Sequence, residues 1–107
     1  MTTTQQAKAF LQAADSLAGL KPAMLAEQLE ISETTLRRKL RQEGANFAKL
    51  LTEERKWRCA QALAANPHIS LADLSDICGF SMSSVMQRAF EVWYDETITQ
   101  WREKHLA

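Results

Sequence analysis

The segment from Ile31 to Gly44 constrains the fold more than any other part of the chain. Ser32 has the short hydroxyl side chain favoured just before a helix, and Gly44 is the kind of residue at which helices commonly end. Between them, Leu36 and Leu40 are four positions apart and therefore share one helical face. This pattern predicts a short helix whose leucine face is buried in a core.

The opposite face of this predicted helix is basic. Burial of the leucine pair leaves four polar side chains facing outward: Thr34, Arg37, Arg38 and Arg41. A guanidinium group can donate two parallel hydrogen bonds to a guanine edge, or it can bind a phosphate. Because a short helix with such a face fits the major groove, we expect it to contact double-stranded DNA.

Glycine and proline are scarce, with three and two residues, and no β-branched alternating run of strand length is present. This composition indicates an all-α protein. Capping and turn residues divide it into about seven helices, arranged as two helix-turn-helix subdomains joined by a long linker helix. The expected division is an N-terminal segment with the first helix at 1–20, the first helix-turn-helix at 21–45, the linker helix at 46–66, and the second helix-turn-helix with a C-terminal helix at 67–107.

Apolar spacing predicts which side chains enter the core. In the first helix, expected at about 5–17, the inward residues are Ala9, Phe10, Ala13 and Leu17. The second helix-turn-helix begins with a short helix after Ser70, whose inward residues are Leu71, Leu74, Ile77 and Cys78. Those of its recognition helix are Val85, Met86, Ala89, Phe90 and Trp93.

Some polar and reactive side chains also fall on apolar stripes. We expect Arg55 to be at least half-buried and paired with a carboxylate or with backbone carbonyls, the alternative being direct DNA contact. Cys59 and Cys78 are expected to be buried, reduced thiols of a cytosolic protein. His68 and His105 have no partner at metal-ligand spacing, so no metal site is expected.

Positive charge is concentrated in the middle of a chain whose formal net charge is zero. Residues 37–58 carry eight Lys or Arg against three Asp or Glu, whereas both flanking segments are acidic. A local basic block can attract the phosphate backbone. The neutral total supports an alternative function, a helix-turn-helix module used mainly for protein–protein interaction.

Other functional classes are not expected. No run approaches the roughly 18–20 apolar residues that cross a bilayer, and the N-terminus lacks the features of a secretory signal. A cytoplasmic location without a membrane partner is therefore expected. No nucleophile–base pair, metal cluster or phosphate-binding glycine loop is evident, so we expect no catalytic residue, no cofactor and no enzyme activity.

Two groups of residues follow a pattern found in one known family. The first comprises Leu36–Gly44, Phe47, Leu50, Leu51 and Arg55. The second comprises Ser70–Ser81, Arg88–Phe90, Trp93, Trp101 and Arg102. Together they resemble the AraC/XylS family of bacterial transcription regulators, over about Pro22 to Arg102, and the second group is the more specific of the two.

The resemblance implies a DNA-binding domain whose two recognition helices occupy successive major grooves, about 34 Å apart. The family's base-contacting positions fall here on Thr34, Arg37, Arg38, Ser83, Ser84, Gln87 and Arg88. Thr35 and Arg41 are neighbouring candidates, with Arg41 expected at a phosphate. The resemblance also implies a regulator, either an activator or a repressor, that acts beside a promoter by contacting RNA polymerase. It further implies an effector-binding or dimerisation domain that lies N-terminal to this module, outside this chain.

This chain departs from the family pattern in the second unit. Glu91 stands where the family usually has a basic residue, Met86 where it commonly has an aromatic one, and Asp95 and Ile98 where it has Gly and Pro. Carboxylates repel phosphate. We therefore expect the second unit to bind DNA more weakly than the first.

Overall fold

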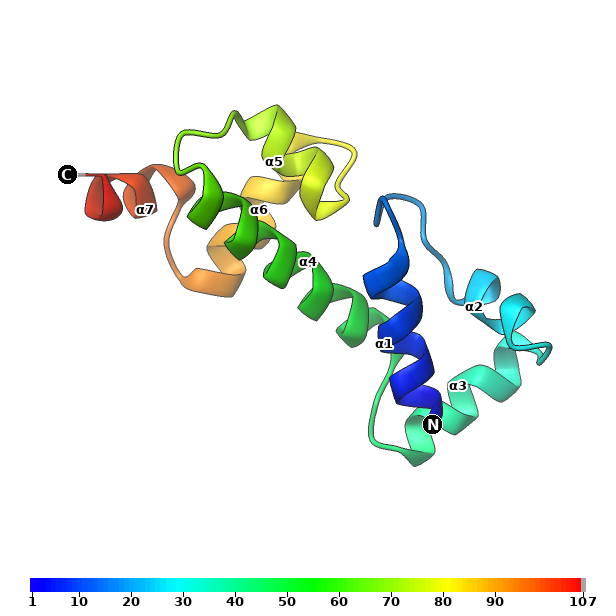
Figure 1. Cartoon of the computed structure of the whole chain (residues 1–107). Coiled ribbons are helices and arrows are strands. Elements are labelled where there is room, and N and C mark those ends of the chain that lie inside the picture. Colours follow the sequence, from blue (N-terminus) through cyan, green and yellow to red (C-terminus); the bar gives the residue numbers. More distant parts are fainter. Residues whose placement is uncertain (107) are drawn as a thin grey trace. The chain divides into compact units, whose positions relative to one another are not determined.

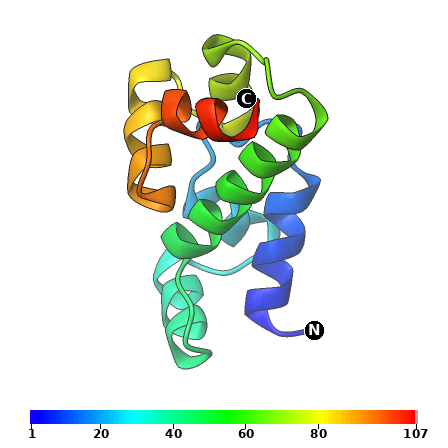
Figure 2. The ribbon, with the colours of Figure 1, turned by 90° about the vertical axis from the view of Figure 1, so that its left-hand side faces the viewer.

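The computed structural model describes residues 1–106, and all the regular secondary structure in this part of the chain is helical, without a strand (Figure 1, Figure 2). Its elements are α1 (Thr3–Ala13), α2 (Pro22–Gln28), α3 (Glu33–Gln42), α4 (Phe47–Ala65), α5 (Leu71–Cys78), α6 (Ser83–Tyr94) and α7 (Ile98–His105). The predicted all-α fold, with two helix-turn-helix subdomains and a long helix between them, is confirmed.

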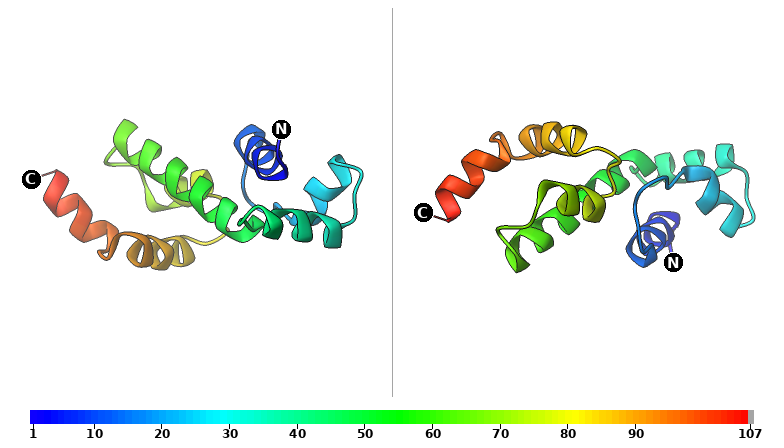
Figure 3. Two further views of the ribbon diagram at one scale, coloured as in Figure 1. Left: turned by 90° about the horizontal axis from the view of Figure 1, so that it is seen from below. Right: turned by 90° about the horizontal axis from the view of Figure 1, so that it is seen from above.

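The chain forms two compact units, one from Met1 to Glu54 and the other from Arg55 onward, so the boundary falls inside α4. The core of the first unit consists of Ala7, Leu11, Leu17, Leu25, Ala26, Leu36, Leu40 and Phe47. The core of the second consists of Cys59, Leu63, Ile69, Leu74, Cys78, Met86, Phe90 and Ile98. The continuous helix α4 (Figure 3) therefore contributes side chains to both cores.

The first helix-turn-helix consists of α2, a tight turn and α3. Glu30 adopts the left-handed conformation in the turn, with φ 58°. The Ile31 N–H donates to the Ala26 carbonyl at 3.0 Å and closes the end of α2. Ser32 then caps α3 by accepting a hydrogen bond from the Thr35 N–H at 3.0 Å, as the sequence predicts.

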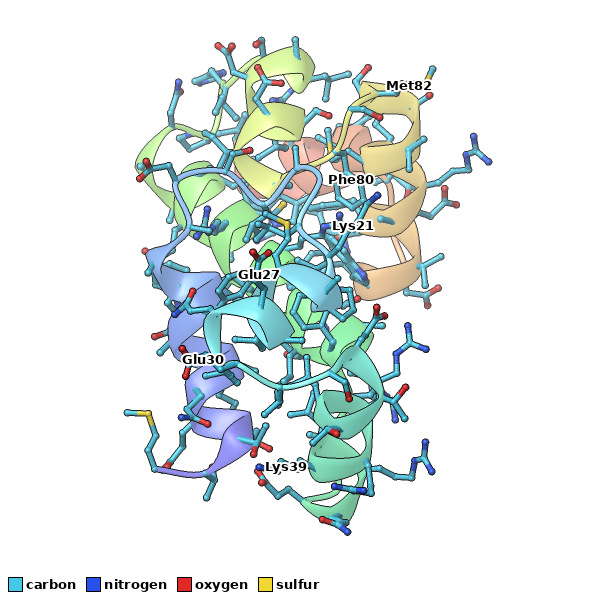
Figure 4. All side chains as sticks on the ribbon, turned by 90° about the vertical axis from the view of Figure 1, so that its right-hand side faces the viewer. Lys21, Glu27, Glu30, Lys39, Phe80 and Met82 are labelled. Carbon is cyan, nitrogen blue, oxygen red and sulfur yellow. The ribbon has the colours of Figure 1, made fainter. Side chains whose placement is uncertain are left out.

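The second helix-turn-helix consists of α5, a turn and α6. Gly79 ends α5 in the left-handed conformation, with φ 83°, and the Phe80 N–H donates to the Ser75 carbonyl at 3.0 Å. The Ser75 hydroxyl donates to the Phe80 carbonyl at 3.1 Å, which holds the same turn from the other side. Met82 precedes α6 without a side-chain capping bond and lies exposed at its start (Figure 4).

Arg55 is held inside the second unit. Its Nη2 donates to the Gly79 carbonyl at 3.5 Å, and its guanidinium carbon lies 4.4 Å from the centre of the Phe80 ring. Burial lowers the pKa of Arg55 below its ordinary value, because the charged form loses hydration. The predicted half-buried arginine paired with a carbonyl is confirmed, and its side chain braces the turn before α6.

The two cysteines meet in the second core. Cys59 of α4 and Cys78 of α5 are both buried and free, as expected. The hydrogen bond that joins their side chains, together with burial, raises the pKa of Cys78. The Cys78 thiol therefore stays protonated and serves as a packing group.

The prediction for the first helix was wrong in its limits and its inward face. The helix begins at Thr3 because Thr2 and Gln5 form a capping box, and it ends at Ala13. Its buried face consists of Thr3, Ala7 and Leu11, whereas the expected core residues Ala9 and Ala13 are exposed. Phe10 is half-buried, and Leu17 reaches the core from the loop after the helix.

Two apolar residues of the second unit are also not where spacing predicted them. Ile77 is 41% exposed and Val85 is 42% exposed, whereas their neighbours Cys78 and Met86 are fully buried. Each residue lies at the edge of the apolar stripe of its helix, where the core covers the neighbouring side chain and leaves this one partly exposed to solvent.

The start of α1 is joined to the end of α3 by Glu43. Its carboxylate accepts hydrogen bonds from the Thr4 hydroxyl at 2.6 Å, the Thr4 N–H at 2.8 Å and the Thr3 N–H at 3.2 Å. A carboxylate at a helix N-terminus is favoured by the helix dipole. These bonds, above all the one from the Thr4 hydroxyl, lower the pKa of Glu43.

We predict that Glu43→Gln weakens the acid dependence of stability. The lowered pKa means that Glu43 contributes stability above the pKa of the unfolded state and loses it as pH falls through the folded-state pKa. Melting temperatures between about pH 6 and pH 3 should therefore fall more steeply for the parent chain than for the variant. Glu27→Gln, which changes an exposed acid on α2, is the control. Identical pH profiles for the parent and Glu43→Gln would contradict this role.

We predict that Arg55→Ala lowers the free energy of unfolding by about 1–3 kcal/mol, because the cation–π contact and the side-chain packing are both lost. Arg55→Met should cost less, since it keeps the aliphatic stem and removes the Nε that is buried without a hydrogen-bond partner. Urea unfolding measures both values. An unchanged midpoint for Arg55→Ala would show that the turn does not depend on this side chain.

Candidate nucleic-acid interface

The exposed face of α3 rests on a fully buried leucine pair. Leu36 and Leu40 are 0% and 1% exposed, so the helix has one fixed orientation in the first core. The opposite face consists of exposed polar side chains, Thr34, Arg37, Arg38 and Arg41. The predicted separation of an apolar face from a basic face is therefore present in the structure.

Arg37 is restrained by an acid on its own helix. Its Nη2 donates to Glu33 Oε1 at 2.6 Å, and the two side chains are 64% and 40% exposed, respectively. Glu33 is the first residue of α3 and lies one turn before Arg37. Sequence reasoning missed this residue, although the four-residue spacing of an acid and an arginine is a known signal for such a pair.

Thr35 differs from the other α3 candidates in its burial and in its hydrogen bonding. It is half-buried, and its Oγ1 accepts a hydrogen bond from the Ser32 hydroxyl at 2.9 Å. The side chain therefore takes part in the cap of α3, while Thr34 beside it faces solvent.

The α6 candidates occupy the first two turns of that helix. Ser84, Gln87 and Arg88 are exposed, and Ser83 is half-buried. Exposed Val85, which sequence reasoning assigned to the core, places an apolar group among them. An aliphatic side chain in the major groove can contact the methyl group of thymine, a chemistry that the neighbouring hydroxyl, amide and guanidinium groups of this face lack.

Comparison of the two helices exposes a difference in charge. α3 begins after Ser32 and α6 after Met82, and each buries a pair of side chains four and eight positions later, Leu36 with Leu40 and Met86 with Phe90. Counted from these starts, the corresponding exposed positions are Thr34 and Ser84, Arg37 and Gln87, Arg38 and Arg88, and Arg41 and Glu91. The α6 face thus keeps one of the three arginines and adds an acid.

The chemistry available on these faces is hydrogen bonding and charge. Guanidinium, amide and hydroxyl groups can donate to base edges and to phosphate oxygens. Within residues 1–106, no three His, Cys, Asp or Glu side chains are grouped as metal ligands. No helix in the same range is long and apolar enough to cross a membrane.

Comparison with known proteins places this architecture in a family. The Helix-turn-helix domain family matches residues 25–104. The chain is 33% identical over 90 residues to the HTH-type transcriptional regulator VqsM of Pseudomonas aeruginosa, covering 82% of this chain and 27% of that protein. It is 32% identical over 82 residues to the HTH-type transcriptional regulator GadX of Escherichia coli, covering 77% and 30%. The chain thus spans less than a third of the length of these curated relatives.

A solved structure covers nearly the whole chain. The crystal structure of a DNA-binding transcriptional dual regulator from Escherichia coli K-12 aligns over 97% of this chain and 98% of that one, with a TM-score of 0.82 and 25% identity. Helix α1, which lies outside the family match, is included in the first core. The matched family, the sequence relatives and the shared fold agree, and the chain belongs to the AraC-type helix-turn-helix family of bacterial transcription regulators.

Proposed function

We propose that the chain is the sequence-specific, double-stranded DNA-binding domain of a bacterial transcription regulator, acting in the cytoplasm. The observation that carries the proposal is the α3 face, where Arg37, Arg38 and Arg41 are exposed above a buried leucine pair. A helix oriented by its core presents these donors as a fixed set, which a groove of regular geometry can match.

The side chains of α3 are assigned distinct roles. Arg37 and Arg38 are about 100° apart around the helix, so they reach different partners. We assign one or both to guanine edges, where a bidentate contact is worth about 1–3 kcal/mol of discrimination. Arg41, one turn further along, is assigned to phosphate, and Thr34 to a thymine methyl or a phosphate.

The second recognition helix contributes less in this proposal. Ser83, Ser84, Gln87 and Arg88 contact bases or phosphates in the next major groove along the duplex, as the family pattern implies. Glu91 occupies the position that corresponds to Arg41 of α3 and opposes phosphate binding. We therefore assign most of the affinity to α3.

We infer the remaining partners from the family pattern. The proposed regulator acts as an activator that contacts RNA polymerase, and this chain is joined to an N-terminal effector-binding or dimerisation domain. The sequence relatives are more than three times as long as the matched segment, which supports the presence of a further domain but does not bear on RNA polymerase. The alternative function, protein binding by the helix-turn-helix module, is favoured by the zero net charge.

Selection of bound duplexes from a random DNA pool at about 100 mM salt tests the proposal. The expected product is a motif with two half-sites about 10 base pairs apart. A single half-site would assign base recognition to one helix only. No enrichment by folded protein, together with an affinity for duplex that does not fall between about 50 and 200 mM salt, would support the protein-binding alternative instead.

Variants of the arginines connect the selected motif to the two helices. Arg37→Ala with Arg38→Ala should abolish specific binding while the helical content stays unchanged, because both side chains are exposed. Arg88→Ala should cost less than this change, since α6 carries one cation. Binding of the selected duplex by the double variant as tightly as by the parent would remove α3 from the interface.

A further inference from the structure

The ion pair between Glu33 and Arg37 places a negative charge on the face that we assign to DNA. Glu33 begins α3, the end of a recognition helix that contacts base edges in helix-turn-helix proteins. A carboxylate there is repelled by phosphates, so it weakens general attraction to the duplex. Its presence beside a base-contacting arginine therefore requires a reason other than affinity.

Of the three arginines on the exposed face of α3, Arg37 alone forms an ion pair in the described residues. Within residues 1–106 the structure contains no ion pair for Arg38 or Arg41, whereas Arg37 is bonded to Glu33 at 2.6 Å. At the corresponding positions of α6, the residues are Ser83 and Gln87, which carry no charge. The restraint is thus applied to a single side chain in the two recognition helices.

The ion pair between Glu33 and Arg37 contributes little to folding stability. Both side chains are substantially exposed, 64% for Arg37 and 40% for Glu33, and exposed ion pairs contribute little to stability. Ser32 already caps α3, so the helix start does not depend on Glu33 for a hydrogen-bond acceptor. The main effect of the contact is to limit the rotamers of Arg37, whose side chain is long and flexible.

We propose that Glu33 is a positioning residue that gives Arg37 its base specificity. The contact uses one of the two N–H groups of Nη2, so the guanidinium group keeps enough free N–H groups to form a two-donor contact with the O6 and N7 acceptors of guanine. It also neutralises Arg37 toward phosphate, so the side chain gains most from a neutral base edge. This inference rests on the proposed function, because it assigns a specificity to the same α3 face.

Glu33→Gln tests the inference in the whole chain, with the selected duplex and a random duplex as probes. Loss of the negative charge should raise affinity for the random duplex several-fold and steepen its salt dependence by about one phosphate contact. The ratio of the two affinities should fall about fivefold or more, within the range that a guanine contact provides. Glu33→Asp keeps the charge at the helix start but shortens the reach to Arg37, so its affinity ratio should fall as well.

Two comparisons separate positioning from a general charge effect. Glu27→Gln removes an exposed acid from α2 and should leave the affinity ratio unchanged. In an Arg37→Gln background, Glu33→Gln should no longer change the ratio, because the side chain on which it acts is absent.

The outcomes distinguish this inference from the proposed function. If the parent chain binds the selected and random duplexes equally, both are overturned. If the parent discriminates between them and Glu33→Gln retains the same ratio and salt slope, only the positioning role is overturned. A lower melting temperature with equal losses on both duplexes would likewise overturn it, because the pair would then be structural.

Discussion

Helices as short as α2, α3, α5 and α6 do not persist alone in water, so each depends on burying one face in a small core. α2 has seven residues and α3 has ten, and their buried side chains meet in the first core. α5 and α6 meet in the second in the same way. The exposed faces are consequently rigid, because a rotation of any helix would expose its leucine, methionine or phenylalanine. Orientation of the arginines on α3 is thus a result of apolar burial on its other side.

The elements predicted correctly are those whose signals lie within one segment. For α3, the cap Ser32, the pair Leu36 and Leu40 and the terminal glycine all fall within thirteen positions, and the helix forms between them. α1 was misplaced because its start depends on Thr2 and on Glu43, a residue about forty positions away. Spacing alone also does not tell how wide an apolar stripe the core covers, and Ile77 of α5 and Val85 of α6 each lie at the uncovered edge of a stripe, beside a fully buried residue.

For the candidate interface, the sequence predicts which side chains are exposed, and only some of the contacts among them. Exposure of the α3 arginines and of Ser84, Gln87 and Arg88 follows from helical period, and the structure agrees. The contact of Arg37 with Glu33 was available from four-residue spacing, whereas the participation of Thr35 in the cap depends on the rotamers of two hydroxyl groups. Arg55 shows the converse case, because a charge on an apolar stripe already indicated a carboxylate or a backbone carbonyl as its partner, although not the contact with the Phe80 ring.

Two turns of the chain hold an acidic residue in a conformation that usually belongs to glycine. Glu30 has φ 58° and Asp95 has φ 56°, and both are exposed. Holding an L-residue there costs about 1–2 kcal/mol, which the surrounding hydrogen bonds offset. Replacing both with glycine would relieve that strain and change the formal net charge from zero to +2. Stability and non-specific attraction to polyanions are therefore linked at these positions, and the acids lower both together.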